Sequence, residues 1–490
     1  MQKNDVSFKR DEYKKSQPIW KKLDDVCEGQ LAIKDGGVDY LPKPNPNDLS
    51  AQNQARYSHY VARAVFYNAT GRTLQFLVGA AFRQTPQLEN PASLNYISDD
   101  IDGAGVGVFQ QAQSTLASVL KRGRHGLLAD YPRGQGQTTV AQVQSGNIRA
   151  TAVSIEATDV INWRYEKHGA VYKLSLLVIS EVSEEITPDG FGLASIPQIR
   201  VLRLDGGMYT QELWRKDGDS KDWVIFEPPW VIKSGNGQPW TEIPFTFVGS
   251  ENNDATVDQS PLYDMAELNI AHYRNSADYE DSAFFVGQAQ PWMSGLSEEW
   301  RDHLQETGIY VGSRNPILLP EGGAYGIAQA QPNTLAKEAM DQKERQMTAL
   351  GAKLVQPGGA AKTATEAKGE QQANYSVLSL AAENVSSAYT KVLGWMALFM
   401  NAPGEASMEL NTDFIEHSLE PQMLTALISA YQSGQLPESD LWGQLKKYGV
   451  IDPEKNDDDI RAELELQDDG LGLDDEPDVA IAEDELDANI

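Results

Sequence analysis

The sequence of 490 residues contains a single cysteine, Cys27, so the chain cannot form an internal disulfide bond. A lone cysteine is typical of proteins that fold in a reducing compartment. No apolar run reaches the roughly 18 residues that a membrane span requires, and the first residues lack the apolar core of a signal peptide. We therefore expect a protein made in a cytoplasm, with no membrane partner.

Motifs for catalysis and metal binding are also lacking. The six histidines are scattered, and none has the i, i+4 spacing of a metal site on a helix (His59, His125, His168, His272, His303, His417). His59 and His272 stand beside tyrosines in helical patterns, which favours packed histidines over ligands. No nucleophile elbow occurs, and Cys27 has no evident base partner. The sequence predicts no catalytic residue, no metal site and no cofactor.

Two loops resemble ligand-binding motifs in part. Residues 103–107 are glycine-rich, but Val108 stands where a dinucleotide loop needs its third glycine, so we expect a loop that leads into a helix. Asp217-Gly218-Asp219 begins like a calcium loop. It lacks the central glycine and has Pro228 in place of the bidentate glutamate, which favours a hairpin turn.

Acidic residues are in large excess, with a formal net charge of −30. Much of the excess lies in residues 452–490, where runs of aspartate are separated by glycine, proline and isolated leucine. This pattern has no sustained apolar stripe, so it predicts a flexible acidic tail rather than a calcium site.

The hydrophobic period changes along the chain. Helical periodicity marks 13–26, 51–82 and 108–128, whereas 148–247 alternates with the period of two that indicates strands. Gly206-Gly207 separates two such strands and predicts a hairpin. The sequence thus indicates an α+β fold in which an antiparallel β region is inserted among helices.

The most informative run is 260–402. A helix is expected over 260–286, beginning at Ser260-Pro261, and a second helix over 334–355 after an insert at 287–333. A possible capping box at Thr363 begins a third segment that reaches Met400, which would be roughly 55 Å long at about 1.5 Å per residue. Two short helices follow, over 419–431 and 439–448.

The third segment has its apolar positions at helical spacing (Val377, Ala381, Val385, Ala388, Val392, Trp395, Phe399). We expect a helix this long to need partners on more than one side, which packing between subunits would supply. The alternative is a core helix within one large monomer.

This arrangement resembles the portal proteins of tailed double-stranded-DNA bacteriophages. The resemblance covers roughly residues 57–450 and is strongest in the order and spacing of five stretches (63–70, 77–83, 154–164, 260–273 and 363–367). It implies a ring-forming, portal-like α+β fold with long stem and wing helices, an inserted β wing region, a small clip and a helical C-terminal crown.

The resemblance also implies a division of the chain. The parts are a wing (1–259), a first stem helix (260–286), a clip (287–333), a second stem helix (334–355), a tunnel loop (356–362), a long wing helix with a return strand (363–417), a crown (418–451) and the acidic tail (452–490).

A portal protein forms a homo-oligomeric ring, with twelve subunits implied here, at one capsid vertex of the virion. Double-stranded DNA is packaged through its channel by the terminase motor and later ejected, and the ring contacts the major capsid protein and the head-completion or neck adaptor proteins. The alternatives are another virion protein, such as a neck adaptor or minor capsid protein, or a hydrolase or nuclease with dispersed residues.

The expected DNA-facing residues flank the tunnel loop (Lys353, Gln356, Gly358, Gly359, Lys362). A conduit must let DNA slide, and an acidic wall with few cations avoids the tight phosphate binding of a basic channel. We expect weak contact at Lys353 and Lys362. The alternative is that both are ordinary solvated lysines at helix ends, where Lys353 also complements the helix dipole.

Overall fold

The computed structural model describes residues 5–131, 148–218, 222–288, 290–308, 318–328, 334–355, 376–402, 404–412, 414, 421–447, 450–451 and 455–470. The chain divides into two units, Met1–Phe414 and Ile415–Ile490. Within the described segments, no helix combines the length and the apolar character needed to cross a bilayer.

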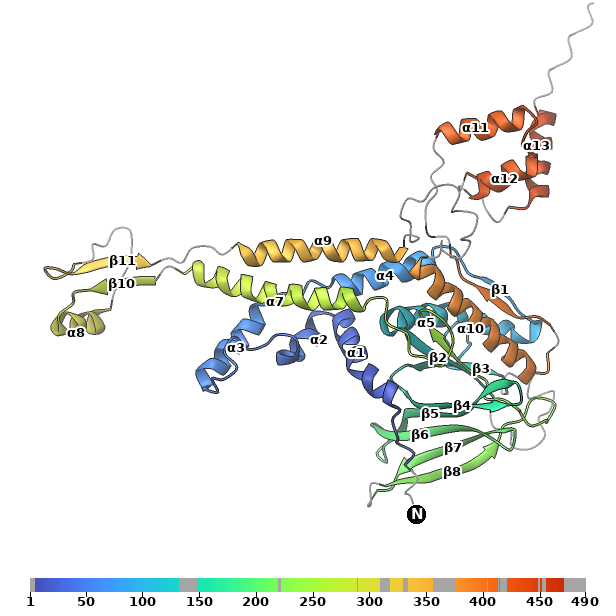
Figure 1. Ribbon diagram of the computed structural model, residues 1–490, viewed down its shortest axis with the longest axis horizontal. Coiled ribbons are helices and arrows are strands. Elements are labelled where there is room, and N and C mark those ends of the chain that lie inside the picture. The colour runs from blue at the N-terminus through green and yellow to red at the C-terminus, as the bar shows by residue number, and fades with distance from the viewer. Residues whose placement is uncertain are drawn as a thin grey trace, which may run out of the picture. The chain divides into compact units, whose positions relative to one another are not determined.

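The first unit begins with short helices (Figure 1): α1 (Asp11–Glu28), α2 (Gln30–Asp35), the 3-10 helix η1 (Gly37–Asp39), α3 (Ala51–Arg63), α4 (Ala69–Ala81), the 3-10 helix η2 (Ala92–Ser98) and α5 (Val108–Arg122). The pattern over 51–82 forms two helices, because the backbone leaves the helical conformation at Ala64 (φ −57°, ψ 137°) and Asn68 caps the next helix, its side chain accepting the amide of Gly71. The glycine-rich loop leads into α5 as expected, and the Asp100 carboxylate accepts the amides of Gly103 and Gly105.

The helix expected over 108–128 ends earlier. Gly123 adopts a left-handed conformation with φ of 73°, and a Cβ at this position would lie 2.4 Å from the Asp258 carbonyl oxygen. The following apolar residues form the buried strand β2 (Arg124–Asp130) instead of further helical turns. The expectation was wrong there because a short buried strand has the same continuous apolar character as a buried helix.

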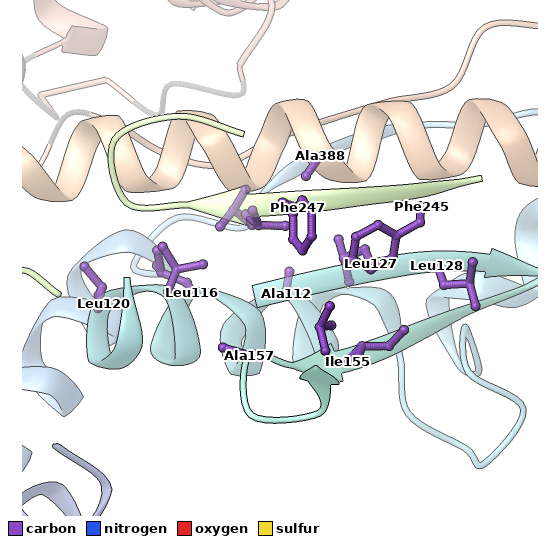
Figure 2. Packing of buried hydrophobic residues seen from close by; sticks show 14 of the residues in the cluster. Ala112, Leu116, Leu120, Leu127, Leu128, Ile155, Ala157, Phe245, Phe247 and Ala388 are labelled. Carbon is purple, nitrogen blue, oxygen red and sulfur yellow. The ribbon is translucent and has the colours of Figure 1, made fainter. Parts of the chain in front are cut away.

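Strand β2 is the centre of a three-stranded antiparallel sheet in the order β3-β2-β9, with β3 (Thr151–Glu156) and β9 (Phe245–Gly249). Helix α5 and the later helix α10 (Val377–Phe399) both pack against this sheet and against each other. Figure 2 shows Leu127 of β2, Phe247 of β9 and Ala388 of α10 in this core.

A second antiparallel sheet of five strands has the order of the chain: β4 (Val160–His168), β5 (Val171–Ile186), β6 (Leu193–Asp205), β7 (Met208–Lys216) and β8 (Trp223–Val231). The predicted hairpin at Gly206-Gly207 joins β6 to β7, with Asp205 opposite Met208. Strands β7 and β8 pair on either side of the turn expected near Asp217. Residues 154–164, one of the stretches that carry the family resemblance, contain parts of β3 and β4, which belong to different sheets.

Two long helices follow, α7 (Tyr263–Val286) and α9 (Leu335–Val355), close to their expected bounds. The segment between them contains β10 (Gln290–Ser294), α8 (Glu298–Thr307) and β11 (Ala324–Ala328), and β10 pairs with β11 in antiparallel register. Ser260 lies just before α7, and its hydroxyl accepts the Leu262 amide.

Helix α10 differs from its expectation in two respects. It begins at Val377, because Ser376 is extended (φ −72°, ψ 160°) and its hydroxyl accepts the Ser379 amide as an N-cap. Its 23 residues span about 35 Å. The stretch 363–375, where the helix was expected to begin, lies outside the described residues. Most of its apolar positions are buried by other elements of the same chain, so the described part of this helix is covered within its own subunit.

The first unit also contains a small sheet in which β1 (Gln87–Glu89) pairs with β12 (Ser407–Glu409). The second unit contains α11 (Pro421–Gln432), α12 (Glu438–Lys447) and α13 (Asp457–Gly470). Helix α13 corrects the expectation of a flexible tail over 452–490 for residues 457–470, whereas residues 471–490 lie outside the described part of the chain. Three aspartates in its first turn complement the helix dipole, and Ile460 is buried, so acidic composition does not prevent this segment from packing.

Candidate functional site

The candidate site is the pair of long helices α7 and α9, which lie side by side (Figure 1). The two helices are antiparallel, because residues of increasing number along α7 contact residues of decreasing number along α9. Met265 lies against Gly351, the His272 Nε2 is 3.1 Å from the Glu344 Oε1, and the Lys343 Nζ donates to the Asn275 Oδ1 at 2.6 Å. At about 1.5 Å per residue, the helices are roughly 36 Å and 32 Å long.

Helix α7 is fixed to the N-terminal helices along its length. The buried Asn269 side chain accepts from the Thr70 amide and hydroxyl and donates to the Tyr67 carbonyl. Further along, the Tyr60 hydroxyl donates to Asp278 at 2.6 Å, and Arg63 forms an ion pair with Asp281. Since these bonds join α7 to α3 and α4, this helix is held on the body of the unit.

Helix α9 is far less covered. Met347 is its one fully buried residue, and a line of exposed side chains follows the i, i+4 ridge opposite (Lys337, Asp341, Arg345, Ala349 and Lys353). We call these five residues the α9 stripe. Cations and one carboxylate are mixed along it, so the stripe presents isolated charges rather than a continuous basic surface.

Of the residues expected to face DNA, the structure places Lys353, which is exposed in the last turn of α9. Gln356, Gly358, Gly359 and Lys362 lie outside the described residues.

A groove of about 900 Å³ opens where the C-terminal half of α9 passes α4. Its lining is largely apolar, and Tyr67 and Phe76 are more than half exposed, at 56% and 64%. Met347 and Val355 line it from α9, and Arg72 supplies its cation. Large exposed aromatic side chains around one groove are typical of surfaces that contact another macromolecule.

The structure also brings together three polar residues that the sequence did not associate. His125 on β2 lies directly opposite Glu156 on β3, and Ser154 is two positions along the same face. The His125 Nε2 is 2.8 Å from the Ser154 hydroxyl, while its Nδ1 is 3.7 Å from the Glu156 carboxylate. Only the strand register places them together, so no spacing in the sequence could have indicated this cluster.

This cluster lacks the geometry of a catalytic triad. The distance from Nδ1 to the carboxylate is too long for the hydrogen bond that orients a catalytic histidine. The Glu156 carboxylate is instead engaged by Arg122 and by the Ser118 hydroxyl. Burial raises the pKa of Glu156, but His125, Arg122 and Ser118 outweigh this effect and lower that pKa to about 2. These features describe a structural ion-pair cluster.

Among the residues that the structure describes, the remaining histidines and acids give no other site. His272 is buried beside the Tyr67 ring, with 5.9 Å between ring centroids, as expected for a packed histidine. Across the described ranges, no group of histidine, cysteine and acidic side chains is arranged to hold a metal ion.

Comparison with known proteins gives the following likenesses. Residues 261–400, from the start of α7 to the end of α10, match the model of a family described as a domain of unknown function (DUF4055). No curated protein matches the chain.

Three solved structures contain similar chains. One is described as the virion of a native gene transfer agent (GTA) particle, with 15% identity, a TM-score of 0.38 and coverage of 81% of this chain and 89% of that one. The second is the neck of the native GTA particle computed with C12 symmetry, with 15% identity, a TM-score of 0.37 and coverage of 77% and 89%.

The third is the neck of the empty particle computed with C6 symmetry, with 16% identity, a TM-score of 0.39 and coverage of 78% and 89%. At these identities and TM-scores, the likenesses carry no conclusion about this chain.

Proposed function

We propose that this chain is a portal protein, which assembles as a ring at one vertex of a phage-like capsid. In this proposal the α7–α9 pairs of the ring surround a channel, twelve copies being the number that the family resemblance implies. Double-stranded DNA passes through the channel, driven by a terminase during packaging. The segment 287–333 forms the clip that meets the motor and later the neck proteins, and the β region forms the wing that meets the capsid protein.

The observation that carries this proposal is the asymmetry of the helix pair. Helix α7 is bonded to the body of its own chain, whereas α9 extends over 21 residues with one fully buried side chain. A helix in water gains most of its stability from burying an apolar stripe, so α9 lacks the cover that its length requires. Neighbouring copies around a ring would provide that cover on its sides and leave the α9 stripe towards the channel.

The charges of the stripe suit a conduit. Each phosphate that a protein neutralises adds to the affinity and slows movement, so a continuous basic wall would hold DNA in place. Lys337, Arg345 and Lys353 are isolated cations, and Asp341 lies between the first two. With a net charge of −30 per chain, the wall would contact phosphates weakly and at few points.

Electron microscopy of the purified full-length protein in negative stain tests this function. We expect rings with a central hole. A compact monomer at all concentrations that supports a hydrolytic activity would overturn the proposal and favour the enzyme alternative.

The two lysines that flank the tunnel loop have a separate test. In a particle-assembly system that packages DNA, we expect Lys353→Ala with Lys362→Ala to change the packaging rate, because the variant removes the cations nearest the loop. The matched control is Lys15→Ala on α1, an exposed lysine outside the helix pair. Unchanged packaging in the double variant would show that the two residues are ordinary solvated lysines.

A further inference from the structure

Strands β5 and β6 of the five-stranded sheet extend together beyond the ends of their neighbours β4 and β7. Strand β4 pairs with β5 only as far as Ile179, and β7 pairs with β6 only from Gln198 onwards. Strands β5 and β6 nevertheless continue to pair with each other as far as Ile186 and Leu193. We call residues 181–197 the ribbon. An isolated pair of strands is marginally stable in water, so such an extension gains from a surface that covers it.

The two faces of the ribbon differ in chemistry. One face begins a ladder of polar bonds that continues onto β6 and β7. Glu181 binds Arg200 at 2.7 Å, and Arg215 binds Glu185 at 2.6 Å and Gln198 at 3.2 Å. Its charged side chains are therefore already paired within the chain.

The other face of the ribbon is apolar and uncovered. Ile186 and Leu193 lie directly opposite each other and are 73% and 64% exposed, and Val182 on the same face is 65% exposed. Phe191 in the turn is 96% exposed. Glu184 and Ser195 lie between these apolar side chains on the same face. Exposed apolar side chains with polar residues around them are typical of docking surfaces.

The opposite end of the same sheet has a complementary character. The turn between β4 and β5 exposes Val171 at 60% and Tyr172 at 66%. Lys167 lies directly opposite Tyr172 on one face of the sheet, whereas Val171 and Lys173 lie on the other face. The ribbon's apolar face carries the exposed Glu184 instead. Two ribbons in mutual contact would bring like charges together, whereas contact between opposite ends pairs acid with base.

We propose that the ribbon of one copy docks on the β4–β5 end of the sheet in the next copy. This inference rests on the proposed function, since it identifies one subunit contact of the ring. Each copy then uses two different surfaces, and head-to-tail contacts of this kind close into rings when the rotation allows it. The five-stranded sheets of neighbouring copies are then in contact at every subunit boundary of the ring, in addition to the contacts between helices.

Cysteine pairs test the docking directly. The double variant Tyr172→Cys with Leu193→Cys places one thiol beside Lys167 and the other on the ribbon. These positions are about 45 Å apart along β5 in one chain, so a short bismaleimide can join them only between copies. The native Cys27 interferes little, because burial raises the pKa of its thiol to about 11 and thereby suppresses the reactive thiolate.

We expect the double variant to give a ladder of cross-linked species beyond the dimer, and each single variant to give none. The control Tyr172→Cys with Ala194→Cys moves the second thiol to the polar face and should cross-link several-fold less. Efficient dimers from Leu193→Cys alone would show ribbon-to-ribbon contact and overturn the inference. If the wild type forms rings but the double variant gives no cross-linked ladder, the inference is overturned and the proposed function stays intact. If the wild type forms no rings, the proposed function itself is contradicted.

Exchanging the charges of Lys167 and Glu184 tests whether the ribbon docks on the β4–β5 end of a second copy. Lys167→Glu should weaken association about two- to fivefold, the value of one exposed ion pair, and adding Glu184→Lys in the same chain should restore it. Because the two residues are about 40 Å apart within a chain, restoration requires a second copy. An equal association constant in all three proteins would show that the ribbon does not dock on this end.

Discussion

At the scale of single residues, Glu156 shows how a buried cluster can stabilise a fold without acting as a catalyst. Its carboxylate is held by Arg122 and Ser118 beside His125, and its pKa in the folded protein is about 2. The ordinary glutamate pKa is about 4.3. The carboxylate therefore favours the folded state above pH 4.3, and this contribution is lost as the pH falls from there towards 2.

Replacement of this carboxylate should give a pH-dependent loss of stability. We expect Glu156→Gln to lower Tm at pH 6, because Arg122 keeps Asp24 but loses its second charged partner, and the difference from the wild type should close between about pH 4.3 and pH 2. Calorimetry across this range provides the measurement. Glu405→Gln, at an exposed position just before β12, is the matched control and should leave Tm nearly unchanged at every pH. A difference that stays constant down to pH 2 would refute the linkage.

At the scale of elements, local signals predicted some boundaries and tertiary contacts set others. Helices α7 and α9 were predicted to within three residues, because Gly287 ends one pattern and Pro332 precedes the other. The boundary between α5 and β2 was missed because Gly123 is required by its close approach to Asp258. In the candidate site, Lys353 was predicted near the end of its helix, where the structure also has it. The cluster around His125 was not predicted, because it depends on strand register, which local sequence patterns do not determine.

The C-terminal helices give a prediction at this scale. Helix α13 packs against α12: Lys446 forms an ion pair with Asp457, and the Arg461 guanidinium lies 5.6 Å from the centre of the Trp442 ring. Deleting 452–490 should therefore expose Trp442 and increase hydrogen exchange across α12. Deleting 471–490 leaves every contact described here in place and serves as the control.

Ring assembly is the second readout, and neither deletion should abolish it, because the surfaces proposed for subunit contact lie in the first unit. Loss of rings on deletion of 452–490 would show that the C-terminal unit takes part in assembly. Unchanged exchange across α12 would show instead that α13 contributes nothing to the stability of its neighbour.

At the scale of the whole molecule, net charge opposes the assembly that the helix pair and the ribbon favour. Each copy carries a formal charge of −30, so copies in a ring repel one another over the Debye length, about 30 Å at 0.01 M salt and about 10 Å at 0.1 M. The proposed pair between Glu184 and Lys167 contributes only about 0.2–1 kcal/mol. Long-range repulsion therefore outweighs this local attraction, while the apolar contacts are little affected by screening.

Assembly should consequently become more favourable as salt rises. Sedimentation velocity at fixed protein concentration should show the ring fraction increasing between about 0.02 M and 0.3 M NaCl, because the Debye length falls over this range from above about 10 Å to below about 8 Å. Deleting 471–490 removes acidic residues and no basic ones, so the truncated chain should reach the same ring fraction at lower salt. A ring fraction that falls steadily with salt would mean that attractive ion pairs between subunits, rather than apolar contacts working against repulsion, hold the ring together.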